Sequence, residues 1–231
     1  MRFCMFSPRD AGLERGWPGR IERDRVIQLA AQTLQSYFSG GGKAREHAEF
    51  ALDDVVLRPP VLHPPSVRNF EGLEFRFSNP ASIYGPEDQI PYPEETEGLL
   101  YGLQTAAVIG AKGAIGGFTI MNDWRARDLT PAKDTDFATS IGPVVVTPDE
   151  VGNGMVVRVN GEEAELRSLS DSAHSWDEIV ARAAQNTRLM PGDLIGAGKA
   201  GSKRLLRPGD VIELEVEGIG VLRNAVTASR A

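Results

Sequence analysis

Residues 118–128 read FTIMNDWRARD, and residues 134–143 continue with DTDFATSIGP. The first stretch opens with aromatic, apolar and β-branched residues, which predicts a buried strand over residues 116–121. It then turns polar at Asn122. Polar residues gathered at the end of a strand are where folds commonly place binding groups, so a functional site is expected here.

The charged residues of this motif allow two interpretations. Asp123 supplies carboxylate oxygens, which hard cations prefer as ligands, and Arg127 can hold a carboxylate through two parallel hydrogen bonds. Alternatively, Arg125 and Arg127 neutralise the aspartates beside them and the loop is purely structural, because structural ion pairs are common. Spacing alone leaves both interpretations open.

Two further apolar runs, residues 105–109 and 144–147, predict strands next to this one. Residues 111–117 connect the first run to the FTIM strand and hold three glycines. This connection is too short for the helix of a parallel crossover, so a hairpin is expected.

The C-terminal part of the chain carries two strong local signals. Asn160-Gly161 lies between two apolar-alternating runs, and this dipeptide tolerates the positive φ angles that a tight hairpin turn requires. Ser175, followed by Glu178 three residues later, has the form of a capping box. A hairpin and a helix over residues 175–185 are therefore predicted.

The N-terminal part has a different character. Residues 1–6 predict a strand and residues 9–20 a loop or hairpin. Apolar residues recur at helical spacing over residues 23–38, which predicts a helix, and the glycines at 40–42 end it.

Four prolines between residues 58 and 65 indicate a rigid extended connector, because proline fixes φ and removes a backbone donor. This connector is a natural boundary. It predicts a small N-terminal module over residues 1–57 and a larger β-rich domain over residues 58–231.

The composition excludes several classes of protein. A net charge of -7 argues against a nucleic-acid partner, which would need a basic face. No apolar run reaches the roughly 20 residues of a membrane helix, and no signal-like segment opens the chain. The single cysteine, Cys4, lies in an apolar run and is expected to be an inert core thiol. A cytoplasmic protein is expected.

The glycine-rich segment 196–201 lacks the spacing of a phosphate-binding loop, so a nucleotide site is not expected. Its role is that of a loop that brings Lys199 near a cavity. His174 stands beside the start of the predicted helix, where a neutral surface role is expected, and no serine, histidine and acid arrangement stands out.

Taken in order, these motifs resemble the fumarylacetoacetate hydrolase family over about residues 60–226. The resemblance is carried by FSNP at 77–80, AAVIG at 106–110, NDW and ARD at 122–128, DFATS at 136–140, GP at 142–143, NG at 160–161, PGD at 191–193 and GIG at 218–220.

The resemblance implies an α+β, β-rich fold: a mixed β-roll with few helices, preceded by a small α/β module and usually assembled as a homodimer. Members of the family hydrolyse, isomerise or decarboxylate small oxo-acids. They commonly use Mg²⁺ or Mn²⁺, which polarises the oxo-acid and stabilises the enolate as it forms.

This sequence departs from the family at the expected metal site. The family's Glu-x-Glu pair aligns with Gly102 and Gln104, so Asp123 is the only retained carboxylate ligand. The threonine of the family's GT motif aligns with Lys199, and residues 69–75 contain no counterpart of the usual catalytic histidine. Because affinity for a hard cation follows ligand charge, Mg²⁺ or Mn²⁺ binding should be weakened and no cofactor is expected.

Two hypotheses follow. The first is a divergent enzyme that acts on a small oxo-acid without the usual metal, with Asp123 or Glu74 as the base. Its expected residues are Asp123, Arg127 and Lys199 as catalytic groups, and Gln104, Arg125 and Thr139 as substrate-binding groups. The second hypothesis is a catalytically inactive pseudoenzyme that serves as a binding or structural subunit.

Overall fold

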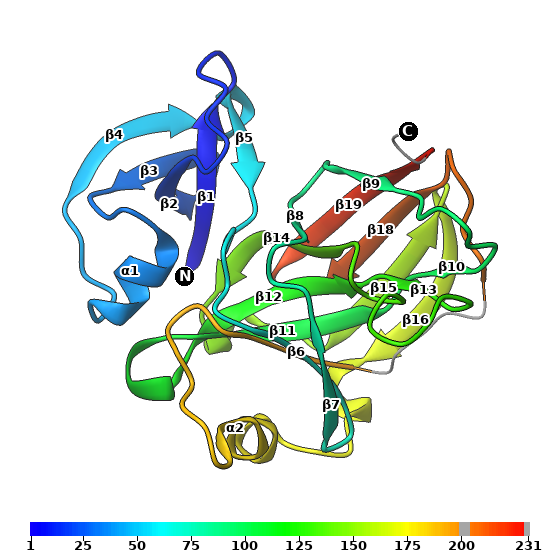
Figure 1. Ribbon diagram of the computed structural model, residues 1–231. Coiled ribbons are helices and arrows are strands. Elements are labelled where there is room, and N and C mark those ends of the chain that lie inside the picture. Colours follow the sequence, from blue (N-terminus) through cyan, green and yellow to red (C-terminus); the bar gives the residue numbers. More distant parts are fainter. Residues whose placement is uncertain (199–203, 229–231) are drawn as a thin grey trace.

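The computed structural model describes residues 1–198 and 204–228 (Figure 1). Strands hold far more of these residues than helices do, and the two α-helices in this part of the chain are short: α1 (Leu34–Ser39) and α2 (Trp176–Ala184). The β-rich α+β fold expected from the sequence is confirmed. No helix within the described ranges is long and apolar enough to span a membrane.

The larger sheet holds twelve strands. Ten form a continuous path in the order β4 (Glu46–Ala51), β3 (Arg25–Leu29), β2 (Trp17–Glu22), β1 (Arg2–Pro8), β14 (Thr139–Val146), β12 (Ile115–Asp123), β11 (Leu103–Ile109), β17 (Leu194–Ala197), β6 (Val67–Glu71) and β7 (Glu74–Ser78). Two more join at the side: β5 (Val55–Arg58) pairs with β1, and β8 (Ile83–Tyr84) pairs with β14.

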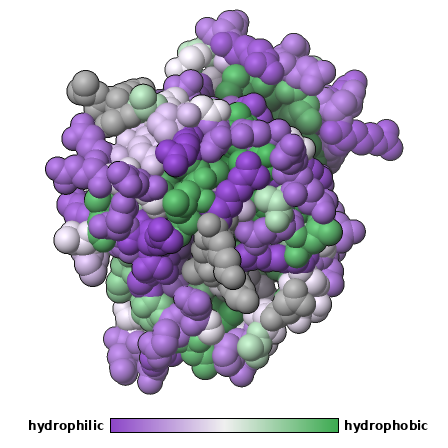
Figure 2. Space-filling model, turned by 90° about the vertical axis from the view of Figure 1, so that its right-hand side faces the viewer, coloured by the Kyte–Doolittle hydropathy of each residue, from purple (hydrophilic) through white to green (hydrophobic). Residues whose placement is uncertain are grey.

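A second sheet has five strands, in the order β16 (Glu162–Ser168), β15 (Gly154–Val159), β18 (Val211–Val216), β19 (Gly220–Thr227) and β9 (Gln89–Pro91). A short ribbon pairs β10 (Leu99–Leu100) with β13 (Arg125–Ala126). In Figure 1 the N-terminal strands and α1 lie to the left, the five-stranded sheet lies to the right, and α2 lies below. The face on the right of that view is mostly hydrophilic, with several smaller hydrophobic patches (Figure 2).

The N-terminal helix prediction is wrong over most of its length. Residues 23–38 form β3, a loop and the short α1 rather than one helix. Val26 and Ile27 are buried in β3, because β-branched side chains suit a half-buried pleated surface. Arg23, with φ at 55°, makes the turn from β2, and Thr33 caps α1.

Several other local predictions are confirmed. β1 covers residues 2–6 of the predicted strand 1–6, and β11 and β12 form the expected antiparallel hairpin. Asn160 and Gly161, with φ at 55° and 80°, connect β15 to β16. Ser175 caps α2, and Glu178 completes the capping box.

The N-terminal strands continue the same sheet as the rest of the chain, since β1 pairs with both β14 and β5. The division of the chain at residues 57 and 58 stays a prediction. Cys4 is fully buried in β1, and this burial raises the pKa of its thiol, as an inert core thiol requires.

Strand alternation divides the core into two clusters on opposite faces of the large sheet. Leu103, Ala107 and Ile109 of β11 pack in the cluster that includes the smaller sheet and α2. Ala106 and Val108, between them, pack in a second cluster with α1 and β1. Neighbouring residues of β11 therefore serve different sides of the molecule.

Candidate functional site

Three of the predicted site residues meet on one face of the large sheet. Asp123 at the end of β12 pairs directly with Thr139 at the start of β14, so their side chains lie on the same face. Gln104 on β11 pairs with Met121, two residues before Asp123, and therefore shares that face. Gly102 stands beside them, since its carbonyl accepts the Asp123 N–H at 3.0 Å.

The hairpin of β6 and β7 lies opposite these residues of β11, β12 and β14 and forms the other side of the site. Asn69 and Arg76 are paired across it, and the guanidinium of Arg76 donates to Oδ2 of Asp123. In a flat sheet β7 would lie four strand spacings, about 19 Å, from β12, which is farther than two side chains reach. The sheet must therefore curl, and its curl closes the site.

In this ion pair the carboxylate is buried and the guanidinium is partly exposed to solvent. The Asp123 side chain is 3% exposed and that of Arg76 is 28% exposed. Burial lowers the pKa of Arg76, and the positive charge of Arg125 lowers it further. Arg76 still remains a cation, because the ordinary pKa of a guanidinium lies far above neutral pH.

Several buried polar atoms around this ion pair have no hydrogen-bond partner among the described residues. They are Oδ1 of Asp123, Oε1 and Nε2 of Gln104, Oδ1 of Asn69, Oγ1 of Thr139 and Nε of Arg76. Folded proteins pair nearly all buried polar groups, since leaving one unpaired costs about 1–3 kcal/mol. A concentration of them at one place is typical of a site that receives a polar ligand or ordered water.

Gly196 on β17 makes room for the Gln104 amide. It pairs with Ala106 on one side and Asn69 on the other. A Cβ at position 196 would lie 2.3 Å from Oε1 of Gln104 and 1.9 Å from Cε of Met121. Glycine within a strand often marks such a close approach, and this signal was available in the sequence.

Within the described residues, Arg125 and Arg127 make no hydrogen bond to this cluster. Arg125 pairs with Asp134 at 3.0 Å, and Arg127 is exposed, with its backbone N–H bonded to the carbonyl of Gly98. Lys199 lies outside the described residues. Glu74 is almost fully exposed beside Arg182, and its proposed role as a base stays a prediction.

The structural interpretation of the NDWRARD loop needs correction. Asp123 is paired with Arg76 from a distant hairpin, and not with the neighbouring Arg125 or Arg127. Arg76 was missed by sequence reasoning. The available signal was weak: a charged residue in the alternating strand EFRFS, at a position that faces inward once the sheet curls.

The family's divalent ion does not fit this donor set. Gly102 has no side chain, and a Cβ there would already lie 3.2 Å from the carbonyl oxygen of Asp123. Gln104 offers a neutral oxygen, and the carboxylate of Asp123 is engaged by Arg76. In residues 1–198 and 204–228, no three His, Cys, Asp or Glu side chains are grouped closely enough to hold a metal.

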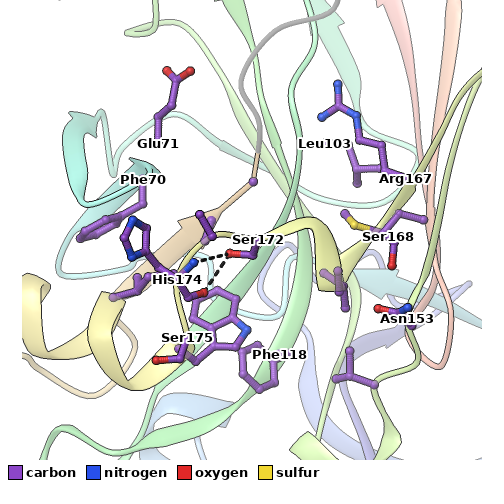
Figure 3. A pocket seen from close by; sticks show the side chains of 18 of the residues that line it. Phe70, Glu71, Leu103, Phe118, Asn153, Arg167, Ser168, Ser172, His174 and Ser175 are labelled. Carbon is purple, nitrogen blue, oxygen red and sulfur yellow. Dashed lines mark hydrogen bonds between the residues drawn. The ribbon is translucent and has the colours of Figure 1, made fainter.

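A cavity of about 1680 Å³ lies on the opposite face of β11 (Figure 3). Leu103, next to the Gln104 of the polar cluster, lines it together with Phe70, Phe118 and Trp176. In Figure 3, Ser172 bonds to the backbone of His174 at one end of this cavity.

Two of the charged residues that line this cavity, Glu165 and Arg167, pair with each other. Glu165 accepts a hydrogen bond of 3.0 Å from the Tyr101 hydroxyl and also pairs with Arg167. Among the described lining residues, none has a buried side-chain nitrogen or oxygen without a partner. The polar cluster around Asp123 is therefore the better candidate for chemistry.

Comparisons with known proteins agree with this fold. A 5-carboxymethyl-2-hydroxymuconate delta-isomerase from Mycobacterium smegmatis superposes with a TM-score of 0.85 at 23% identity, covering 99% of this chain and all of that one. A 2-hydroxyhepta-2,4-diene-1,7-dioate isomerase from Mycobacterium marinum superposes with a TM-score of 0.82 at 25% identity, over the whole of both chains.

Two sequence relatives each match over 63% of the chain. An uncharacterized protein from Methanocaldococcus jannaschii, MJ1656, is 37% identical over 164 residues, which are 63% of this chain and 69% of that protein. The mitochondrial oxaloacetate tautomerase Fahd2a of Rattus norvegicus is 29% identical over 175 residues, 63% of this chain and 56% of the relative. The family model for the fumarylacetoacetate (FAA) hydrolase C-terminal region matches residues 57–227. The chain therefore belongs to the fumarylacetoacetate hydrolase family.

Proposed function

We propose that this protein is an enzyme that acts on a small oxo-acid and forms its enolate in the polar cluster around Asp123. The observation that carries this proposal is the group of buried donors and acceptors at Asp123, Gln104, Asn69 and Thr139 that have no partner among the described residues. The names of the similar proteins, an oxaloacetate tautomerase and two isomerases of unsaturated acids, support the same class of substrate.

Enolate formation needs a base and a donor for the oxygen that becomes negative. Oδ1 of Asp123 takes the proton from the carbon next to the carbonyl group, and the electrons of that bond move onto the carbonyl oxygen. Nε2 of Gln104 donates to this oxygen. Return of the proton to another carbon or to the oxygen completes an isomerisation or tautomerisation, without any change of oxidation state.

The inactive alternative also has an observation in its favour. Asp123 is the only carboxylate of the cluster among the described residues, and it is engaged in an ion pair. A carboxylate held in this way can serve structure alone. In that case the protein keeps the fold of the family without its catalytic activity and binds a ligand or a partner. A homodimer and a cytoplasmic location, which the sequence also predicts, remain part of the proposal.

Hydrogen–deuterium exchange at the substrate carbon next to the carbonyl group tests the proposal, because it reports enolate formation whichever product is released. Oxaloacetate, acylpyruvates and 2-oxoglutarate would be incubated in D₂O with the full chain, and loss of the C–H signal followed by NMR. We expect enzyme-dependent exchange with at least one of these acids. Asp123→Asn should slow it by roughly 100-fold or more, as removal of a general base does. Absence of exchange and turnover with every acid, in a folded protein, would support the inactive alternative.

A further inference from the structure

Arg76 is a cation that the fold places directly against the buried carboxylate of the site. Its guanidinium donates to Oδ2 of Asp123, a residue 47 positions away in the sequence. A buried carboxylate needs a partner, because an isolated charge is strongly disfavoured in a low-dielectric interior. The ion pair is therefore a permanent part of the site in the folded protein.

The guanidinium of Arg76 keeps unused hydrogen-bonding capacity. Its Nε is buried without a partner among the described residues, and an arginine side chain carries five N–H donors in a rigid fork. Asn69, its cross-strand neighbour, and Gln104 contribute further unpartnered atoms. Because the Arg76 side chain is 28% exposed, a small anion can approach it from solvent.

The charges of the ion pair do not favour a divalent cation. One carboxylate and one guanidinium sum to zero, whereas a divalent ion would need further carboxylates to balance it. The remaining groups at this position, Gly102 and Gln104, bring no charge. A divalent ion at Oδ2 of Asp123 would also have to displace Arg76 and lie beside its positive charge.

We infer that Arg76 is the resident cation of this site: it binds the carboxylate and enolate oxygens of a small oxo-acid anion directly, so that the site needs no divalent metal. This inference rests on the proposed function and specifies how its substrate is held. Arginine suits the task, since its planar fork matches a carboxylate with two parallel hydrogen bonds.

Two titrations of the full chain test the inference. The first adds Mn²⁺ alone and measures free Mn²⁺ by electron paramagnetic resonance; we expect no binding up to millimolar concentration. The second adds oxalate, a planar dianion that resembles the enolate of an oxo-acid, in EDTA-containing buffer and measures heat by calorimetry. We expect saturable binding that added Mg²⁺ does not strengthen.

Variants of Arg76 test whether oxalate binds to its guanidinium. Arg76→Lys keeps the charge but loses the fork, and it should weaken oxalate binding by roughly tenfold. Arg76→Gln combined with Asp123→Asn removes both charges, so no charge is left buried alone, and oxalate binding should fall by roughly 100-fold or more. Arg158→Lys is the matched control, because Arg158 is similarly exposed and paired with Glu215 in the other sheet.

The outcomes separate this inference from the proposed function. Mn²⁺ binding by the wild type, or oxalate binding that requires Mg²⁺, overturns the role of Arg76 and leaves the oxo-acid proposal standing. Oxalate affinity that is equal in the wild type, in Arg76→Lys and in the double variant also overturns it. Failure of oxalate to bind, with no exchange at any oxo-acid, overturns both.

Discussion

The two faces of β11 show how one strand serves two different environments. Gln104 points to a face where a buried ion pair and unpartnered polar atoms gather. Leu103, one residue away, points to a large cavity with a mixed apolar and polar lining, in which Glu165 pairs with Arg167. The polar atoms that have no partner among the described residues therefore gather on the face of β11 opposite this cavity.

The difference between the two faces is one of energetic cost. Unpartnered buried polar atoms reduce the stability of the folded state, and a protein retains such a concentration where a ligand uses it. The apolar face carries no such cost, and its residues stabilise the fold by leaving water. Substitutions that affect one face and not the other can test this division.

The largest effect on stability is expected for Asp123→Ala on the polar face. This change leaves the Arg76 guanidinium, which is mostly buried, without its partner. Breaking a fully buried pair costs about 3–5 kcal/mol, and we expect about 3 kcal/mol here because Arg76 reaches solvent. Urea unfolding of the wild type and the variant measures this difference.

Asp136→Ala is the matched control for Asp123→Ala. Asp136 pairs with Lys133, whose side chain is 72% exposed, so its loss should change the free energy of unfolding by less than about 0.5 kcal/mol. Equal losses in the two aspartate variants would contradict the buried character of the ion pair between Asp123 and Arg76.

A smaller loss is expected for Gly196→Ala, which adds one methyl group to the polar face. The new Cβ would collide with Met121 and with the Gln104 amide, and overpacking of this kind costs about 1–3 kcal/mol. Oxalate binding should be lost as well, because Gln104 is displaced. Gly154→Ala is the control: its Cβ would have only ordinary contacts, at 3.6 Å and beyond, so stability and binding should both be retained.

The fold could be predicted from sequence where the signals are local. The Asn160-Gly161 turn and the Ser175 capping box each need only a few adjacent residues, and both are confirmed. The prediction of one helix over residues 23–38 was wrong, because helical spacing of apolar residues also arises when a buried strand is followed by a short helix. The pairing of β3 with β2 makes residues 25–29 a strand, and the periodicity of a sequence does not predict such pairing.

The site could be predicted only in part. Asp123, Gln104 and Thr139 come together because strand register places them on one face. Arg76 could not be predicted as their partner, because its approach depends on the curl of a sheet across four strand spacings.

A third, smaller effect concerns the helix beside the cavity. Ser175→Ala removes the side chain that accepts the Glu178 N–H at the start of α2, which should cost about 1 kcal/mol. Oxalate affinity should not change, since α2 lines the cavity rather than the polar cluster. Thermal unfolding and calorimetry measure the two quantities. Ser175→Asp keeps the acceptor and should retain stability; a loss of oxalate affinity in Ser175→Ala would show that the two faces are coupled.

The smallest effect concerns Asp128, a carboxylate of the same motif as Asp123 that lies on neither face. The Glu97 N–H and the Thr96 hydroxyl donate to it and hold its pKa below the ordinary value. A lowered pKa in the folded state contributes stability above the ordinary value of about 3.9, and this is lost as the pH falls through the folded-state pKa. Thr96→Val should therefore raise the pKa of Asp128, measured by NMR titration of its carboxyl carbon, without affecting oxalate binding at neutral pH. If Thr96→Val weakened that binding, the loop would belong to the site, and the motif's two aspartates would share a role that we propose for Asp123 alone.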